Sequence, residues 1–322
     1  MRREWSARIA VVLILAGLPL AVLGYQYGLL PLLSSERIVT VAASIPETGG
    51  FSPASIQVRA GEAVTLRFTS VDVTHGIAIG PGLGVDLGQV DPGKTREISL
   101  TFEQGGIYTF YCTVWCSPNH WRMRGILEVT DVDGTIPPFP PDPVIELLVA
   151  EGINIDAAST PVLLQSSASL LSLTNGATVA AELNLPADLH NAVWRRTHTP
   201  QQVMLLLTML YPAVSQRDLA DAVAYLWRPS EEPSERTAQL YEQNCAACHG
   251  QFGQGDGFAA ALTTVQPSVF TDLVYMFTRR GDVLYAKIRR GGMGTDMPNF
   301  GTLFTPEETW ALVDFLWSLS LQ

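Results

Sequence analysis

The stretch YCTVWCSPNHWRM, residues 111–123, holds two cysteines, a histidine and a methionine. The whole chain of 322 residues has four cysteines, and half of them lie here, four positions apart. Thiolate, imidazole and thioether groups are the ligands that copper prefers. The spacing Cys112-x3-Cys116-x3-His120-x2-Met123 therefore predicts a copper site.

A second histidine and the extra cysteine indicate which kind of copper site this is. His75, in SVDVTHGIAI, stands at the start of an earlier predicted strand. A mononuclear blue-copper site uses two histidines, one cysteine and a weak methionine, so one cysteine is left over here. Because two thiolates can each bridge two metal ions, the set predicts a dinuclear centre with one histidine for each copper. Such a centre changes little in geometry on reduction, which favours fast electron transfer.

Two other uses of this cysteine pair are open from the residues alone. A Cys112–Cys116 disulfide is possible outside the cytoplasm, but it leaves the neighbouring histidines and the methionine unexplained. Zinc binds cysteine and histidine readily, but it has no use for Met123. Copper accounts for all of these side chains together.

The residues around these ligands, 36–135, have the pattern of a β-sheet domain. Polar and apolar residues alternate in VTLRFT (64–69) and in ISLTF (98–102). Such alternation buries one face of a strand and exposes the other. Glycine-rich turns such as GPGLG separate the runs. Several short strands at this spacing predict an all-β sandwich or barrel.

The other two cysteines belong to NCAACHG, where Cys245, Cys248 and His249 form the C-x-x-C-H signature of covalent haem c attachment. A CxxC redox pair is the alternative, but no thioredoxin-like βαβ pattern surrounds the motif. Downstream, GGMGTDMPNFG offers Met293 and Met297 as the second axial ligand. A histidine–methionine pair raises the reduction potential, which suits an electron carrier.

The N-terminal residues predict a membrane anchor. Arginines precede an apolar run, residues 9–33, that is long enough to span a bilayer as a helix. A cleaved signal peptide is the alternative, but the run is long for one and no clear cleavage site follows. The basic flank stays inside, which predicts a single-pass protein of the bacterial cell membrane with its soluble domains on the outer, periplasmic or extracellular face. The formal net charge of −11 argues against nucleic acid as a partner.

Proline-rich stretches divide the chain. PPFPPDP and RPSEEPSE flank a segment whose second half has a helical pattern. Its SQRDLADAVAYLW resembles TPEETWALVDFLW near the C-terminus, so the segment is either a haem-less cytochrome c-like remnant or a set of ordinary amphipathic helices. The predicted divisions are the anchor helix (1–35), a copper-binding domain (36–135), a linker (136–143), the helical middle segment (144–228), a second linker (229–235) and a cytochrome c domain (236–322).

The copper stretch resembles the dinuclear (Cu-A) loop of cytochrome oxidase subunit II and of nitrous oxide reductase, which lies on a cupredoxin Greek-key fold. The likeness covers residues 37–131, with every side-chain ligand in register. It implies five side-chain ligands, namely the bridging thiolates Cys112 and Cys116, the terminal imidazoles His75 and His120, and the weak ligand Met123.

The same resemblance gives roles to three further residues. Val114 stands where a backbone carbonyl binds the other copper, and many members of the family have glutamate there. A carbonyl ligand does not need that side chain, but a carboxylate role such as holding a magnesium ion is put in doubt. Trp115 and Trp121 flank the ligands, where tryptophan commonly serves core or rim packing. In this family, exposed aromatic residues near the copper mark the surface where electrons enter, which is the alternative role.

The C-terminal domain resembles small bacterial cytochromes c, in which the distal ligand is a methionine that precedes a proline. This implies Met297, rather than Met293, as the axial ligand opposite His249. It also implies that the carbonyl of Pro267 braces the haem histidine. The remaining histidines are His190 and His198. They have no cysteine or methionine beside them and are expected to be structural or solvent-facing.

Together these features resemble subunit II of a haem–copper terminal oxidase with a fused cytochrome c, the caa-type arrangement. The implied fold is multidomain: a transmembrane helix, an all-β cupredoxin sandwich and an α-helical cytochrome c domain. The implied function is that of a non-catalytic electron-transfer subunit with a dinuclear copper centre and one covalent haem c. Its partners would be a polytopic haem–copper catalytic subunit and a soluble or membrane-bound donor, such as a cytochrome c or a cupredoxin.

Two departures from that pattern leave other functions open. Subunit II usually has two membrane helices, where one is predicted here, and the middle segment of 85 residues is an addition. The chain could therefore feed electrons to a nitric oxide reductase, or act as a free membrane-anchored shuttle. A nitrous oxide reductase needs a second, histidine-rich copper cluster, and the five histidines of the chain are too few for it.

Overall fold

A computed structural model describes residues 15, 17, 19, 20, 37–157 and 171–321 of the chain. The predicted anchor (1–35) lies outside the described residues apart from those first four positions. No helix in the part of the chain that the structure describes is long and apolar enough to cross a membrane.

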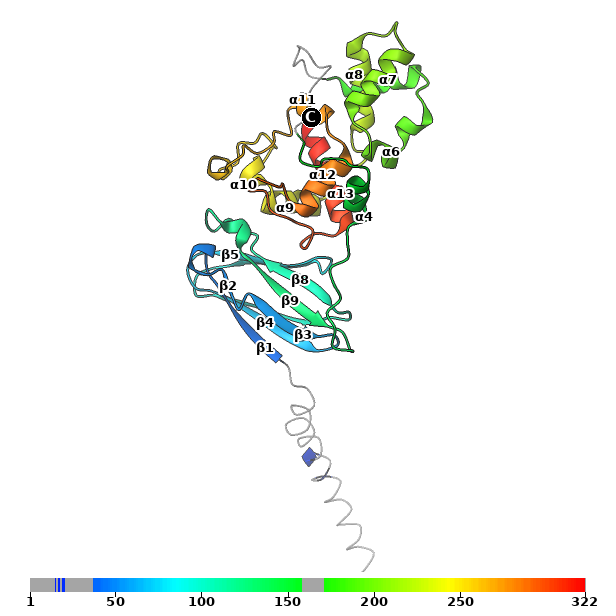
Figure 1. Cartoon of the computed structure of the whole chain (residues 1–322). Coiled ribbons are helices and arrows are strands. Elements are labelled where there is room, and N and C mark those ends of the chain that lie inside the picture. Colours follow the sequence, from blue (N-terminus) through cyan, green and yellow to red (C-terminus); the bar gives the residue numbers. More distant parts are fainter. Residues whose placement is uncertain (1–14, 16, 18, 21–36, 158–170, 322) are drawn as a thin grey trace, which may run out of the picture.

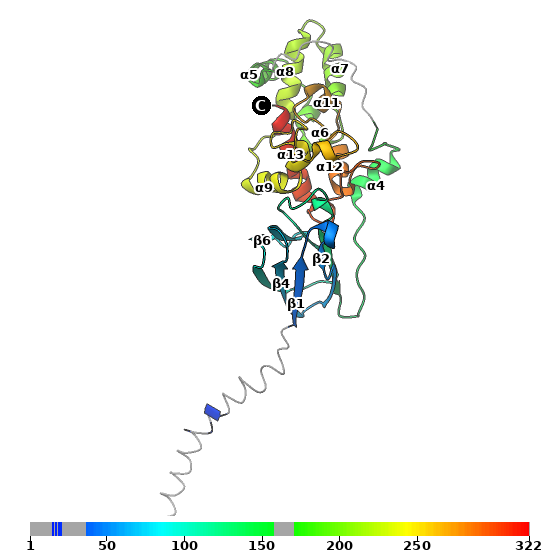
Figure 2. The ribbon, with the colours of Figure 1, turned by 90° about the vertical axis from the view of Figure 1, so that its left-hand side faces the viewer.

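Three bodies lie in a row in Figures 1 and 2. The β domain (37–135) is at one end, the C-terminal domain (235–321) is in the centre, and helices of the middle segment (171–228) form the far end. The middle segment comes before the C-terminal domain in the sequence but lies beyond it in space. The C-terminal domain therefore contacts both of the other bodies.

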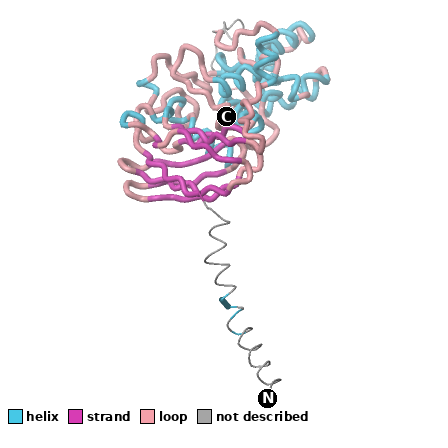
Figure 3. Tube along the Cα trace, turned by 60° about the horizontal axis from the view of Figure 1, so that its bottom comes forward, coloured by secondary structure: helices cyan, strands magenta, loops and turns pink. Residues whose placement is uncertain are grey.

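The β domain is a sandwich of two sheets, seen edge-on as stacked strands in Figure 3. The four-stranded sheet has the order β2 (Phe51–Ser52), β1 (Arg37–Ala43), β4 (Ala63–Ser70), β7 (Thr95–Thr101). The five-stranded sheet has the order β3 (Ser55–Arg59), β9 (Arg124–Thr130), β8 (Gly106–Tyr111), β5 (His75–Gly80), β6 (Val85–Val90). The predicted all-β domain is thus confirmed.

The predicted alternation explains the core of this sandwich. Val64, Leu66 and Phe68 of β4 are fully buried between the sheets, while the residues between them face outward to varying degrees. Phe68 packs against Phe51 and Phe110 with ring centroids 5.6–6.1 Å away. Burying each such side chain contributes about 1.5–3 kcal/mol.

The C-terminal domain is helical, as expected. Its helices are α9 (Glu235–Asn244), α10 (Ala246–His249), α11 (Leu273–Phe277), α12 (Gly281–Arg290) and α13 (Pro306–Ser320), with the short 3-10 turn η6 (Ala260–Leu262). The last helix begins with a capping box, in which the Thr305 hydroxyl accepts from the Glu308 N–H and the Glu308 carboxylate accepts from the Thr305 N–H. Helix α9 packs against α13.

The middle segment contains α5 (Leu173–Glu182), η5 (Ala187–His190), α6 (Ala192–Arg196), α7 (Pro200–Leu210) and α8 (Gln216–Trp227). Helices α5 and α8 approach closely because Gly176 has no side chain, and a Cβ there would collide with the backbone of Asp221. Trp227 at the end of α8 meets Trp317 of α13 edge to face, at 6.5 Å between centroids. The core of the middle segment is therefore continuous with that of the C-terminal domain.

Helix α4 (Pro143–Ala150) follows the extended linker and packs against α12. Its cap residue, Asp142, accepts hydrogen bonds from the Arg289 side chain at 2.8 Å and from the Tyr285 hydroxyl at 2.9 Å. Both members of the Asp142–Arg289 ion pair are more than nine-tenths buried. The end of the linker is thus fastened to the C-terminal domain before the chain continues into the middle segment.

Candidate copper and haem sites

Three neighbouring strands bring the predicted copper ligands to one end of the sandwich. His75 is the first residue of β5, Cys112 follows the end of β8, and Met123 immediately precedes β9. His120 begins the short turn η4 (His120–Arg122). Because β5, β8 and β9 are adjacent in one sheet, ligands far apart in sequence converge at this edge.

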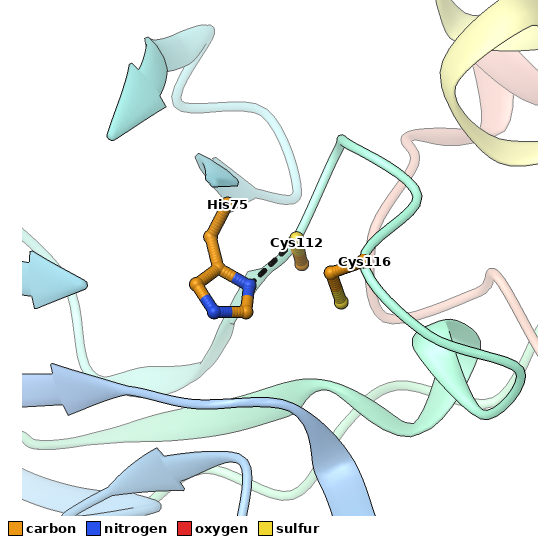
Figure 4. A group of neighbouring side chains, drawn as sticks. All are labelled: His75, Cys112 and Cys116. Atoms are coloured by element: carbon orange, nitrogen blue, oxygen red, sulfur yellow. Dashed lines mark hydrogen bonds between the residues drawn. The ribbon is translucent and has the colours of Figure 1, made fainter. Parts of the chain in front are cut away.

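The donor atoms of these residues lie within reach of a compact metal centre. The sulfur of Cys112 is 3.8 Å from His75 Nδ1, and the sulfur of Cys116 is 3.6 Å from His120 Nδ1. The Met123 sulfur is 3.7 Å from that of Cys116. Figure 4 shows the two cysteines and His75 pointing toward one another, and their donor atoms all lie within 4.8 Å.

The sixth predicted ligand is also in place. The carbonyl oxygen of Val114 lies 3.1 Å from the sulfur of Cys112, inside the loop. Both cysteines are free thiols, so the disulfide alternative is not formed. The convergence of a thioether with two thiols and two imidazoles fits copper better than zinc.

Asp72 holds His75 for metal binding, and the sequence analysis missed this residue. Its Oδ1 accepts a hydrogen bond from Nε2 of His75 at 2.8 Å, so Nδ1 is left free on the side that faces the cysteines. Burial opposes protonation of His75, but hydrogen bonds to Cys116 and Asp72 outweigh it and raise the pKa of His75. In the sequence, Asp72 is simply an acidic residue three positions before His75, and this spacing is too common to predict a hydrogen bond between them.

The two thiols form a coupled pair. A hydrogen bond from Cys116 lowers the pKa of Cys112, although burial acts against it. The same bond, together with burial, raises the pKa of Cys116 to about 11. Metal binding must therefore displace at least one thiol proton.

Glycine at position 76 lets the copper loop lie directly on β5. A Cβ there would collide with the Thr113 hydroxyl. The N–H of Thr113 donates to the Gly76 carbonyl at 3.2 Å, and the N–H of Cys112 donates to the Met123 carbonyl at 3.1 Å. These bonds hold the loop in a defined conformation before any metal arrives.

A cleft in the C-terminal domain contains the predicted haem-binding residues, Cys245, Cys248, His249 and Met297. Apolar residues of three helices line its walls: Tyr241 of α9, Ile288 of α12, and Leu312 and Leu316 of α13. Such a cleft fits a large, flat, apolar group whose iron is bound from two sides. Burial raises the pKa of Cys245 to about 12 and also raises that of Cys248. A redox-active CxxC pair has a lowered thiol pKa, so the shift found here does not favour that alternative.

The residue that braces the haem histidine is Ser268, not Pro267 as predicted. The Nδ1–H of His249 donates to the Ser268 carbonyl at 3.1 Å, which leaves Nε2 for the iron. Burial lowers the pKa of His249, although this hydrogen bond acts against the shift, and the neutral form is the one that binds a metal. The proline lies one residue too early in the loop for its own carbonyl to reach the ring.

The structure separates the two candidate methionines. Met297 lines the haem cleft and packs against the core, whereas the side chain of Met293 is 73% exposed. The carbonyl of Met297 accepts from the N–H of Gly292 at 3.2 Å, which folds its loop back onto the end of α12. The geometry favours Met297.

A cation in the cleft was not predicted from the sequence. Lys287 of α12 lines the cleft, and burial and the nearby Arg279 lower its pKa. An anionic group beside it, such as a haem propionate, would favour the protonated lysine and so act against both effects. A single lysine on an amphipathic helix does not indicate, from the sequence alone, that it lines a cleft.

The two tryptophans face the chain's own C-terminal domain. Trp115 meets Phe258 edge to face at 4.6 Å, and Trp121 lines the haem cleft beside His120. The copper loop therefore forms part of the wall of the haem cleft. The other two histidines are outside both sites, since His190 is exposed and His198 stacks on Trp194 at 3.6 Å.

Residues 233–316 match the family described as cytochrome c oxidase, cbb3-type, subunit III. Solved structures also match parts of the chain. One, from a haem–copper terminal oxidase dimer, is 20% identical over 40% of this chain and 99% of that chain, with a TM-score of 0.26. The periplasmic domain of cytochrome oxidase subunit II from Bradyrhizobium japonicum is 16% identical over 30% of this chain and 86% of that chain, with a TM-score of 0.25.

A third match is auracyanin A, a blue copper protein from Chloroflexus aurantiacus. It is 20% identical over 30% of this chain and 99% of that chain, with a TM-score of 0.24. Scores this low support no argument about function, so the copper site rests on its own donor atoms and the haem site on its motif and its family match. The family match therefore places a domain similar to cytochrome c at residues 233–316, and this domain follows a β-sandwich that carries the predicted copper ligands.

Proposed function

We propose that this chain is the electron-transfer subunit of a membrane haem–copper terminal oxidase. It would accept electrons at its haem domain, pass them to its copper domain and deliver them to a catalytic subunit. One observation supports this order most strongly: His120, a predicted copper ligand, forms part of the wall of the haem cleft together with Trp121. Two redox groups held this close on one chain exchange electrons without diffusion.

The copper domain would hold two copper ions through Cys112, Cys116, His75, His120 and Met123, with the carbonyl of Val114. The bound pair would supply a one-electron centre whose geometry changes little on reduction. The protein supports this by fixing the ligands in advance. The Asp72–His75 bond sets one imidazole, and the backbone bonds of the loop set the thiols.

The C-terminal domain would hold one haem c through thioether bonds to Cys245 and Cys248, with His249 and Met297 on the iron. The group would supply a second one-electron centre with both axial positions filled, which suits transfer rather than substrate binding. The Ser268 carbonyl orients His249, and Lys287 offers a positive charge to a propionate.

The external donor would meet the haem domain rather than the copper loop. Trp115 and Trp121 were predicted to mark the surface where electrons enter, but Trp115 packs on Phe258 of the C-terminal domain and Trp121 lines the haem cleft. Around the mouth of the haem cleft, Leu262 and Val265 are half exposed or more. Apolar side chains around a redox group suit brief encounters with a soluble carrier, such as a cytochrome c or a cupredoxin.

The location and the partner complete the proposal. An anchor formed by residues 1–35 would hold both domains on the outer face of a bacterial membrane, beside a polytopic catalytic subunit. Gentle solubilisation of native membranes, capture of this chain and identification of what comes with it tests this. A co-purified haem–copper subunit, with oxygen consumed when a reduced donor is added, is the expected result.

Two other outcomes of that experiment would favour the alternatives. Consumption of nitric oxide instead of oxygen would make the chain the input subunit of a nitric oxide reductase. Recovery of the chain alone, still redox-active but consuming neither gas, would make it a free shuttle and refute the oxidase assignment.

A further inference from the structure

The segment 297–304, which begins with the predicted haem ligand Met297, lies between the two domains. On one side it is held by its own domain, because the N–H of Phe300 donates to the Ile288 carbonyl at 3.0 Å. On the other side it contacts the β domain at Asn299, Phe300 and Leu303. The copper domain therefore touches the loop that supplies the haem's distal ligand.

Arg124 makes the polar part of this contact. It follows the predicted copper ligand Met123 directly, and its Nη1 donates to the carbonyl of Asn299 at 2.5 Å and to the side-chain oxygen of Asn299 at 3.1 Å. Its guanidinium also lies over the ring of Phe300, 5.3 Å from the centroid. Asn299 is two residues beyond Met297, so one arginine spans from the copper ligands to the methionine loop.

The charge of Arg124 is satisfied by that loop and not by an acid. Arg124 is partly buried, and no carboxylate within the described ranges forms an ion pair with it. A desolvated cation without hydrogen-bond partners is strongly disfavoured. The two oxygens of Asn299 are its partners in the docked arrangement, and this contact holds the methionine loop against the β domain.

Gly80 makes the steric part of the contact. It ends β5, and a Cβ at this position would collide with the backbone carbonyl of Leu303. A backbone oxygen cannot move aside as a flexible side chain can, so only glycine allows this approach. Beside it, Ala78 and Tyr111 of the β domain are buried in the same apolar core as Leu303.

We propose that Arg124 and Gly80 are positioning residues for the haem, which seat the Met297 loop so that axial ligation depends on docking of the copper domain. This rests on the proposed haem site. Docking and ligation are then coupled, and coupling between two equilibria is reciprocal. Loosening the contact weakens the bond from Met297 to the iron, and loss of that bond loosens the contact.

The test uses the full-length, haem- and copper-loaded protein and compares R124Q, R124K and G80A with the parent. R124Q removes the charged guanidinium group, and R124K keeps a positive charge at this position. G80A places a methyl group against the backbone carbonyl of Leu303. Hydrogen bonds from a charged group of this kind shift such an equilibrium by about tenfold or more. The readouts are the methionine–iron charge-transfer band, carbon monoxide binding to the reduced haem, and the haem reduction potential.

R124Q and G80A are each expected to weaken the band, admit carbon monoxide to a fraction of the molecules and lower the haem potential, with partial recovery in R124K. Arg67→Gln is the matched control, since Arg67 forms an ion pair with Glu97 on the four-stranded sheet and its side chain is 40% exposed. The proposal is overturned if the parent has the band and both R124Q and G80A behave like the control. A parent without the band, unaltered by Met297→Ala, would instead refute the haem ligation on which it rests.

Discussion

Replacement of Asp72 by asparagine tests whether the hydrogen bond behind His75 prepares the copper site. The Asp72 carboxylate accepts from His75 Nε2 at 2.8 Å and from the Ile45 N–H at 2.7 Å, with its two oxygens facing in different directions. Asparagine has one accepting oxygen. If that oxygen serves Ile45, the amide faces Nε2 as a donor, and the ring must carry its proton on Nδ1 instead. The nitrogen meant for copper is then blocked.

The expected loss of copper affinity follows from the lost hydrogen bond between Asp72 and His75. Loss of a hydrogen bond of this kind weakens metal affinity by about 10–100-fold, or about 1.4–2.8 kcal/mol. The assay is a titration of copper into the full-length copper-free protein against a chelator of known affinity, followed by the mixed-valence EPR signal. The fully loaded variant should keep the delocalised signal, because every direct ligand is intact.

Asp91→Asn is the matched control. The carboxylate of Asp91 accepts from the hydroxyl of Thr74, the residue before His75, at 2.9 Å, whereas that of Asp72 accepts from His75 itself. The control should bind copper like the parent protein. Equal copper affinities for D72N and D91N would refute the reasoning, because the Asp72–His75 bond would then contribute nothing to the site.

The remaining predictions address the copper pair, the haem ligand and the linker. Cys116→Ser should abolish the delocalised EPR signal and leave at most a localised signal of one copper, because only two thiolates can bridge two ions. Met297→Ala should remove the methionine–iron band, whereas Met293→Ala should not, because that side chain is 73% exposed. Asp142→Ala should destabilise the C-terminal domain by about 3–5 kcal/mol in denaturant unfolding, because it leaves a buried arginine unpaired. Glu146→Ala, at an exposed position of α4, should change stability by less than about 0.5 kcal/mol.

The convergence of the predicted copper ligands could be expected because most of them lie in one short stretch. From Cys112 to Met123 the order of donors is a local property, and His75 was found because the residue types of a copper set are few. Asp72 was missed because a carboxylate three residues before a histidine has no distinctive spacing. The β-sandwich was predictable from alternation, since Val64, Leu66 and Phe68, at every second position of β4, are the apolar residues that the sandwich buries.

Contacts between distant segments could not be predicted in the same way. The hydrogen bond from Arg124 to Asn299 joins residues 175 positions apart, and nothing in either stretch indicates the other. Sequence alone also fails to give the exact register of a loop. The carbonyl that accepts from His249 belongs to Ser268, one residue after the expected Pro267. The placement of α4 on α12 depends on the buried Asp142 pair, which a proline-rich composition does not reveal.

The most direct test of the account is the transfer of an electron between the two domains of one molecule. A light-triggered reductant supplied below one equivalent would reduce the full-length, oxidised protein, and the haem and copper absorbance bands would be followed in time. The account predicts that the haem is reduced first and that the copper then gains the electron at a rate independent of protein concentration. A rate that rises in proportion to protein concentration, or a haem that stays reduced beside oxidised copper, would contradict it.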